Sequence, residues 1–287
     1  MWHTEMGATM RFFLCVSMGL AVAGVMTSNA SAATCTLIKN LTQLQHIQDN
    51  LTGSYCLAND IDASTKPNFK PIAASGFFSG TLDGQGFTIS NLTVRTTGDR
   101  GGLFGQLNNA TIKNRTLENV DILVSTDQLA GAGALAGTAF ADPSSTTGIA
   151  NVHVSGHVLC RGGSSCDAGG LIGDTSNLLV RDSSSAVEVR GPRFIGGLIG
   201  LTSHGTVTRS YATGAVSCSV SNCMAAGLIG RIGSTAVTLS FATGPVTATG
   251  GNDGRAGGLI GLVEGTPPPS VTKSFALGNV DGGAGAM

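Results

Sequence analysis

The chain has 287 residues, of which 43 are glycine, 5% are aromatic and 11% are charged, and its formal net charge is −1. So few aromatic residues exclude a single large aromatic core, while regularly placed Val, Ile and Leu argue against a disordered chain. The near-neutral charge, without a run of Lys or Arg, argues against binding to nucleic acid or to a membrane surface.

The first 32 residues are expected to be a secretory signal peptide. An apolar run from Phe12 to Met26, too short to span a membrane, follows Arg11 and precedes a small-residue cleavage signal that ends at Ala32. Residues 1–9 carry no positive charge and are interpreted as an upstream extension. No other segment has the length and hydropathy of a spanning helix, so we expect a secreted or bacterial cell-surface protein.

Residues 33–75 are expected to form an N-terminal capping segment. Four apolar residues recur at helical spacing, and Thr42 with Gln45 fits a capping box (Leu41, Leu44, Ile47 and Leu51). A short amphipathic helix here would cover the open end of a repeat array or, alternatively, pack on its side. A strand is expected from Tyr55 to Ile61.

The best acidic cluster comprises Asp60, Asp62 and Asp83. Alternation along a strand places Asp60 and Asp62 on one face, where they could bind Ca²⁺ or act as an acid pair in sugar hydrolysis. The structural interpretation is favoured, in which Asp83 belongs to a turn and Asp60 caps the end of a strand. No cofactor or metal site is predicted.

A Gly-Leu-apolar-Gly core, with Ala in place of some glycines, occurs six times, and its final glycines are 32, 36, 27, 30 and 31 residues apart. The cores are residues 102–105, 134–137, 170–173, 197–200, 227–230 and 258–261. A period in this range is typical of stacked repeats that cannot bury their apolar faces alone. Residues 76–287 are therefore expected to be repeats. Because residues 280–287 stop where another core would begin, we expect the repeats to continue beyond the C-terminus of this sequence as part of a longer polypeptide, or else the last coil to be left open.

Each core is followed by a second motif of β type, clearest at 207–216, 237–246 and 271–280. Its short Val, Thr and aromatic runs are bounded by Gly, Asn and Ser, so about thirty residues would form three short strands and one coil of a β-helix. One column of the motif is uniformly apolar and is expected to face inward (Leu117, Val154, Ala212, Ala242 and Ala276). The neighbouring column is mixed and is expected to face outward (Thr116, His153, Tyr211, Phe241 and Phe275).

These motifs resemble the GLUG-motif repeat family of bacterial secreted and surface proteins. The resemblance covers residues 101–287, and residues 77–94 are similar to the segment that commonly precedes such repeats. It implies an all-β fold, a right-handed parallel β-helix, in an adhesin-like or protease-associated region. The family motif is structural and implies no catalytic residues.

Six of the seven cysteines remain after removal of the signal peptide, and they form three local pairs: Cys35 with Cys56, Cys160 with Cys166, and Cys218 with Cys223. An even number of cysteines in an exported chain predicts disulfides. Metal binding is the competing interpretation, but neither short loop contains a histidine.

Surface chemistry is sparse. The five histidines are scattered (His3, His46, His153, His157 and His204), and no nucleophile, zinc-protease or phosphate-loop motif is present. Outward Tyr211, Phe241 and Phe275 recur in successive coils, where they could stabilise the solenoid by stacking or present a surface to a glycan or protein.

Two functions remain. We expect an extracellular repeat protein that acts as a non-catalytic, adhesin-like display or binding surface for a host or surface glycan or protein. The alternative is a β-helix carbohydrate-active enzyme, a polysaccharide lyase or hydrolase. Paired carboxylates at mid-solenoid would favour the enzyme, but the acids after Gly101 look scattered, Asp167 and Asp174 among them.

Overall fold

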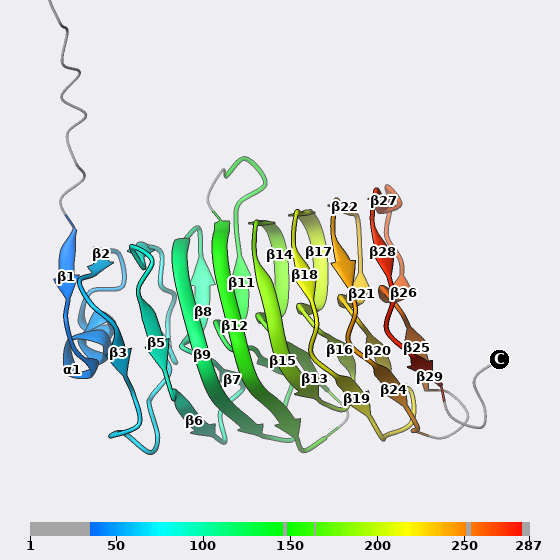
Figure 1. The fold of residues 1–287 in the computed structure, drawn as a ribbon, viewed down its shortest axis with the longest axis horizontal. Helices are drawn as coiled ribbons and strands as arrows, with labels where there is room; N and C mark the ends of the chain where they lie inside the picture. The colour runs from blue at the N-terminus through cyan, green and yellow to red at the C-terminus, as the bar shows by residue number, and fades with distance from the viewer. Residues whose placement is uncertain (1–34, 146–147, 164, 251–253, 283–287) are drawn as a thin grey trace, which may run out of the picture. The chain divides into compact units, whose positions relative to one another are not determined.

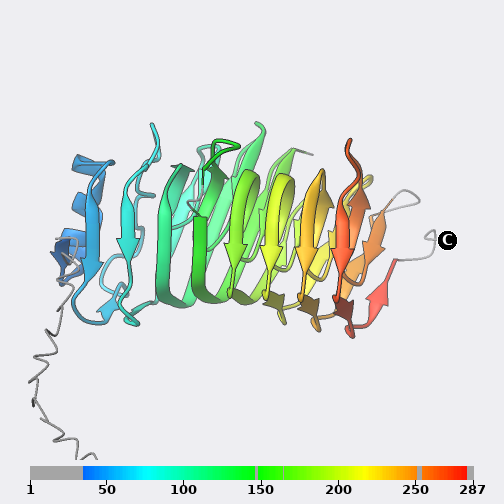
Figure 2. The ribbon, with the colours of Figure 1, turned by 90° about the horizontal axis from the view of Figure 1, so that it is seen from above.

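The computed structural model describes residues 35–145, 148–163, 165–250 and 254–282. The expected signal peptide, residues 1–32, lies outside the described residues. From β1 onward the chain winds into an elongated solenoid whose coils follow one another from the N-terminal to the C-terminal end (Figures 1 and 2). Its strands pair in parallel through about seven turns, so the predicted all-β parallel solenoid is confirmed.

The long strands of the solenoid each bend from one ladder into the next. They are β9 (Thr111–Ser125), β12 (Gly148–Arg161), β14 (Ile172–Arg181), β15 (Ser184–Arg190) and β17 (Ile199–Thr208). Parts of β9, β12, β14 and β17 form the first ladder with β1 (Thr36–Ile38), β2 (Ser54–Leu57), β4 (Thr81–Asp83), β22 (Thr235–Thr238) and β27 (Ser270–Thr272).

Two more ladders follow along each coil. The second contains β3 (Ile61–Asp62), β5 (Thr88–Ser90), β18 (Tyr211–Ala212), β23 (Phe241–Ala242) and β28 (Phe275–Ala276). The third contains β6 (Thr93–Thr96), β19 (Val216–Cys218), β24 (Val246–Ala248) and β29 (Val280–Asp281).

The remaining two ladders flank the Gly-Leu-apolar-Gly core. Before the core lies a separate six-stranded sheet of β7 (Arg100–Gly101), β10 (Ala130–Ala132), β13 (Cys166–Gly169), β16 (Phe194–Gly196), β20 (Met224–Ala226) and β25 (Arg255–Gly257). After the core, the fifth ladder also contains β8 (Phe104–Asn108), β11 (Ala136–Phe140), β21 (Ile229–Ile232) and β26 (Ile260–Val263). Its strands pair in the order β8, β11, start of β14, start of β17, β21 and β26.

The last glycine of the core is required because two backbones meet there. A Cβ on Gly173 would lie 2.4 Å from the backbone nitrogen of Ala132, and one on Gly200 would lie 2.8 Å from that of Ala168. Such distances exclude any side chain. The core therefore forms a corner at which the six-stranded sheet packs closely against the strands that follow it.

The predicted inward column is confirmed for Leu117, Val154, Ala212 and Ala242, which are at most 3% exposed and pair in register with their neighbours. Ala276, in the last of the paired coils, is half-buried. The side chains of this column become smaller, from Leu117 and Val154 to Ala212 and Ala242, because the first glycine of the core packs against them. A Cβ on Gly227 would lie 2.7 Å from the Cβ of Ala242. Small residues on both sides let the coil walls approach.

A serine ladder closes the bend between the first and second ladders. Ser183, Ser210 and Ser240 are buried, and each hydroxyl donates to the carbonyl two residues earlier. Each oxygen also accepts from a backbone N–H of the preceding coil, as Ser210 does from Ser183. The residue before each serine has a positive φ, 47° at Arg209 and 53° at Leu239. Hydrogen bonding thus stabilises a left-handed bend that non-glycine residues otherwise adopt only rarely.

The short N-terminal helix is confirmed, with a different cap. Helix α1 (Leu41–Gln45) continues into the 3₁₀ turn η1 (His46–Asp49), and fully buried Leu44 and Ile47 join the core. The predicted Thr42–Gln45 capping box is wrong, because the N-cap is Asn40, whose side chain accepts from the N–H of Gln43 at 2.9 Å. An Asn side chain at this position satisfies a free N–H of the first turn.

The parallel ladder begins upstream of the first predicted repeat. Strands β1 and β2 pair with each other and β2 with β4, while β3 pairs with β5. The strand expected from Tyr55 to Ile61 is two strands, β2 and β3, separated by three residues. Residues from Thr36 onward therefore already pair as coils of the solenoid, although this segment has no Gly-Leu-apolar-Gly core.

Candidate functional site

The outward aromatic column forms a continuous stack on β18, β23 and β28. The ring centroids of Tyr211 and Phe241 are 4.8 Å apart with an interplanar angle of 0°, and those of Phe241 and Phe275 are 5.3 Å apart at 5°. Parallel register aligns these residues, and the strand spacing of about 4.8 Å brings the rings into contact. Because the facing ring surfaces cover one another, the stack offers mainly ring edges along its length.

The N-terminal acids are held in local hydrogen bonds. Asp60 accepts from the N–H of Thr88 at 2.8 Å, and Asp62 accepts from the N–H and hydroxyl of Ser64. Asp83 accepts from the N–H of Gln85 and forms an ion pair with Lys113 at 3.2 Å. Hydrogen bonds from Asn91 and Ser64 lower the pKa of Asp62. These contacts agree with the structural interpretation of all three residues.

The histidines also have local partners. His153 Nδ1 lies 2.8 Å from the Ser184 hydroxyl, and His46 pairs with Asp49. His157 lies 3.3 Å from Glu188, which also binds Arg190. Within the described residues, no group of three or more His, Cys, Asp or Glu side chains is arranged to hold a metal ion.

Two acids that look scattered in the sequence come together at mid-solenoid. One coil earlier, Gly131 and Thr138 face each other across the core corner, since a Cβ on Gly131 would lie 3.2 Å from Thr138 Cγ2. Asp167 pairs in register with Gly131, and Asp174 with Thr138, so the two carboxylates face each other across the same corner. Sequence reasoning missed this pair. Asp167 and Asp174 lie on either side of a Gly-Leu-apolar-Gly core, and only the corner formed by that core brings them together.

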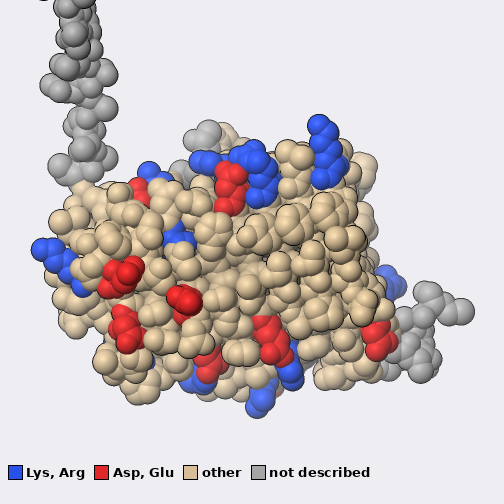
Figure 3. Space-filling model, viewed as in Figure 1, with Lys and Arg blue, Asp and Glu red and all other residues tan. Residues whose placement is uncertain are grey.

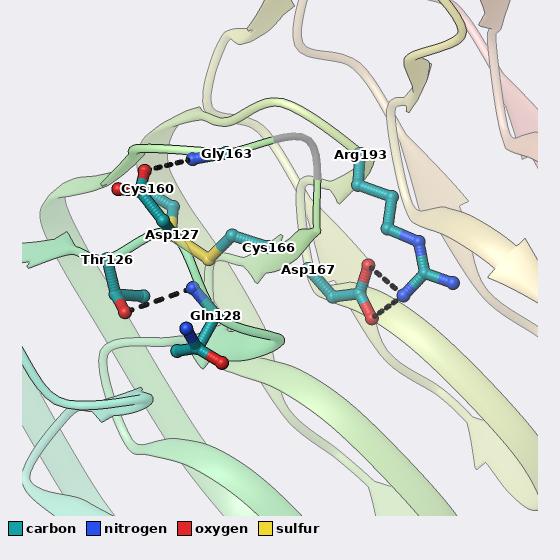
Figure 4. The surroundings of a disulfide bond; sticks show 8 residues. All are labelled: Thr126, Asp127, Gln128, Cys160, Gly163, Cys166, Asp167 and Arg193. Carbon is teal, nitrogen blue, oxygen red and sulfur yellow. Dashed lines mark hydrogen bonds and ion pairs between the residues drawn. A yellow bond between two sulfur atoms is a disulfide. The ribbon is translucent and has the colours of Figure 1, made fainter.

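Two arginines lie near this pair, and Asp167 is buried. Asp167 is 2% exposed, and Arg193 Nη1 lies 3.2 Å from its carboxylate (Figure 4). The guanidinium groups of Arg193 and Arg231 also stack on the Phe194 ring, at 4.5 and 5.2 Å from its centroid. Burial raises the pKa of Asp167 to about 7 against the opposing effect of Arg193, and burial also raises the pKa of Asp174.

Arg115 is a second buried charge. It lies on β9 in register with Val152, is 1% exposed, and its three guanidinium nitrogens have no hydrogen-bond partner within the described structure. Burial lowers its pKa to about 9. The sequence carries no sign of this burial, because an arginine in a β-strand is ordinarily exposed.

The three disulfides join the cysteines paired in the sequence analysis. Their Cα–Cα distances are 5.6 Å for Cys35–Cys56, 6.3 Å for Cys160–Cys166 and 6.3 Å for Cys218–Cys223. The second joins the end of β12 to the start of β13, next to Asp167 (Figure 4). Both short-range bonds thus connect the third ladder to the six-stranded sheet.

A shallow hollow lies beside these disulfides on the outer face of the third ladder. It has a volume of about 440 Å³, and Cys160 and Cys218 both line it. A second hollow of about 270 Å³ shares two lining residues with it, Leu159 and Arg190. On the face of the solenoid shown in Figure 3, most of the surface is uncharged, and the charged side chains occur singly or in small groups.

The fold and these surfaces define a parallel β-solenoid with shallow outer hollows and a buried, ion-paired corner. In the part of the chain that the structure describes, no helix has the length and apolar character needed to cross a membrane. A family model described as the M26 IgA1-specific metallo-endopeptidase N-terminal region matches residues 33–156.

Two curated proteins are similar in sequence. The chain is 32% identical over 252 residues to an immunoglobulin A1 protease of Streptococcus sanguinis, covering 83% of this chain and 11% of that protein. It is 36% identical over 188 residues to halomucin of Haloquadratum walsbyi, covering 59% of this chain and 2% of that protein. The chain therefore spans a small part of each relative.

Solved structures support the fold. One from Bacteroides ovatus, provisionally described as an immunoglobulin A1 protease, superposes with a TM-score of 0.67 at 19% identity and covers 88% of this chain and 86% of its own. Another, described as IgA1 protease, gives a TM-score of 0.62 at 21% identity over 87% of this chain and 21% of its own. At these identities the likeness concerns the fold alone.

Proposed function

We propose that this chain is a display and binding module of an exported or cell-surface protein, and that it is not itself catalytic. The observation that carries the proposal is that its acidic residues are hydrogen-bonded within the fold or buried. Asp60, Asp62 and Asp83 are used in hydrogen bonds of the backbone and of neighbouring coils, and Asp167 is 2% exposed. A group that acts on a substrate must contact it.

The similar proteins support the same role. The matching family model is the N-terminal region of a metallo-endopeptidase family, and the chain spans 11% of the S. sanguinis relative. We infer that the chain corresponds to a structural or binding region of such a protein, consistent with the GLUG-like repeats and the expected export signal. Immunoglobulin A1, which gives that relative its name, and host or surface glycans are the ligands to examine first.

The facing pair Asp167 and Asp174 is the one observation that favours the carbohydrate-active enzyme. A glycoside hydrolase uses a pair of carboxyl groups, one of them with a raised pKa, and here burial raises the pKa of both. The burial of Asp167 and its ion pair with Arg193 instead favour a structural role.

The test is a glycan and protein array beside a polysaccharide-degradation assay, with the purified chain. We expect binding without product release, and we expect Asp60→Asn, Asp62→Asn and Asp83→Asn to alter stability only. Cleavage of a glycan that is lost in Asp174→Asn, while that variant unfolds like the wild type, would establish the enzyme instead.

A further inference from the structure

The two hollows on the third ladder form one groove that runs along the solenoid axis. Its floor is a single column in which Leu159 pairs with Arg190, Arg190 with Ser217, and Ser217 with Thr247. These four residues belong to four successive coils and all line the larger hollow. The strand spacing of about 4.8 Å gives a floor of roughly 14 Å. A ligand lying along the groove would therefore meet a similar position on each coil.

Disulfides fix one side of this groove. Cys160 and Cys218 line it, and each is bonded to the start of the next segment of its coil, at Cys166 and Cys223. Figure 4 shows the first of these bonds joining the two segments beside Asp167. Cross-linked walls hold the lining in place before a ligand arrives, which lowers the entropy cost of binding.

The larger hollow of the groove combines positive charge with hydroxyl groups, whereas two acidic residues, Asp121 and Glu188, line the smaller hollow. Arg161 is exposed, and its guanidinium group has no ion-pair or hydrogen-bond partner within the described residues. Arg190 binds Glu188 through Nε at 2.7 Å and through Nη2 at 2.5 Å. No acidic residue lines the larger hollow, whereas four hydroxyl side chains do (Ser217, Ser219, Thr247 and Thr249).

This chemistry fits a saccharide better than a peptide. The backbone N–H and C=O groups of the groove floor are used by the parallel ladder, so a peptide strand could not add to it. Hydroxyl side chains on a shallow floor suit the many hydroxyl groups of a sugar, and guanidinium groups form strong hydrogen bonds to carboxylate or sulfate.

We propose that the groove lined by Arg161, Arg190, Ser217 and Thr247 binds an acidic polysaccharide, with the two arginines holding its carboxylate or sulfate groups. This inference rests on the proposed binding role and specifies the site and the ligand class. The sugar chain lies along the solenoid axis and contacts successive coils, so its affinity grows with the number of acidic sugars bound.

The experiment measures binding of the purified chain to three probes: polygalacturonate, dextran sulfate and neutral dextran. The variants are Arg161→Gln, Arg190→Gln and the double variant. Arg181→Gln is the matched control, because Arg181 is an exposed arginine on the first ladder, in register with Ala150 and outside the groove. Circular dichroism and thermal unfolding establish that each variant remains folded.

We expect binding to one or both acidic probes, not to neutral dextran, and a weaker affinity at higher salt. Each groove variant should lose about tenfold in affinity and the double variant more, while Arg181→Gln binds like the wild type. The preference between polygalacturonate and dextran sulfate identifies carboxylate or sulfate as the recognised group.

Three results with the purified probes would overturn the groove assignment. They are equal loss in Arg181→Gln, no binding to either acidic probe, and binding to poly-glutamate that is as tight and as sensitive to Arg161 and Arg190. The last would identify an acidic peptide as the ligand. Array binding that survives the double variant would refute the groove and leave the proposed binding function standing.

Discussion

Asp167 and Arg193 form an ion pair of 3.2 Å between the start of β13 and the residue before β16, one coil further along the solenoid. The pair couples two successive coils at the corner where Asp174, Arg231 and Phe194 also meet. Burial raises the pKa of Asp167 from 3.8 to about 7 although Arg193 opposes this shift, so the stability of the solenoid should depend on pH near neutrality.

The folded-state pKa of Asp167 lies above its unfolded value, so its contribution to stability is fully present below pH 3.8 and is lost as the pH rises through about 7. We expect the free energy of unfolding of the wild type, relative to Asp167→Asn, to fall between pH 5 and pH 8. The full shift of about three pKa units corresponds to about 4 kcal/mol at most. The neighbouring charges are Arg193, Asp174 and Arg231.

Urea unfolding of both proteins across this pH range measures the effect. Asp182→Asn is the control, because Arg209 holds the pKa of Asp182 below its usual value and its contribution to stability changes only below pH 3.8. A constant difference between the wild type and Asp167→Asn from pH 5 to pH 8 would refute the titration of Asp167 in this range.

Arg115 should lower the stability of the solenoid. Its guanidinium is buried with no partner in the described structure, so folding removes a charge from water without compensation. We expect Arg115→Met, which keeps the length and apolar stem, to raise the free energy of unfolding by about 1–3 kcal/mol. The exposed Arg181→Met should change it by less than about 0.5 kcal/mol. Destabilisation by Arg115→Met would instead indicate a buried partner for the guanidinium, such as water.

The aromatic stack should stabilise the solenoid in proportion to the number of ring contacts. Phe241 stacks on two rings and Phe275 on one. At about 0.5–1.5 kcal/mol for each pair, Phe241→Leu should cost about 1–3 kcal/mol and Phe275→Leu about half as much. Leu277, 74% exposed, provides the control variant Leu277→Ala. Equal costs for the two phenylalanine variants would contradict a stack that acts through its ring faces.

The disulfides should contribute unequally. In the chain-entropy model a loop of about 15 residues gives about 3 kcal/mol. Cys160–Cys166 and Cys218–Cys223, with sequence separations of 6 and 5, should each contribute less, and Cys35–Cys56, with a separation of 21, should contribute more. Paired Cys→Ala variants compared by urea unfolding measure the order. Mass spectrometry after periplasmic expression should find no free thiol among these six cysteines, and free thiols would refute the pairing.

Much of the fold could be predicted because successive coils repeat the same sequence motifs at equivalent positions. The glycine cores predicted the stacked repeats, and alternation in the second motif predicted both the inward column and the aromatic stack. The serine ladder also had a visible signal, because Ser210, Ser240 and Ser274 recur at one position of that motif. The coils of residues 36–62 escaped prediction, since they pair in the same ladders without a glycine core.

The sequence by itself determined the repeat period, the parallel solenoid and the three local disulfides, because these depend on residue spacing and on contacts between neighbouring coils. Tertiary structure alone decided which charges are buried and which meet. Asp167 faces Asp174 only because the glycine corner folds one strand against the next, and Arg193 reaches Asp167 only through the stacking of coils. Burial of Arg115 and the groove beside Arg161 likewise depend on how whole coils pack. The identity of a charged residue in the sequence does not indicate which residues surround it in the fold.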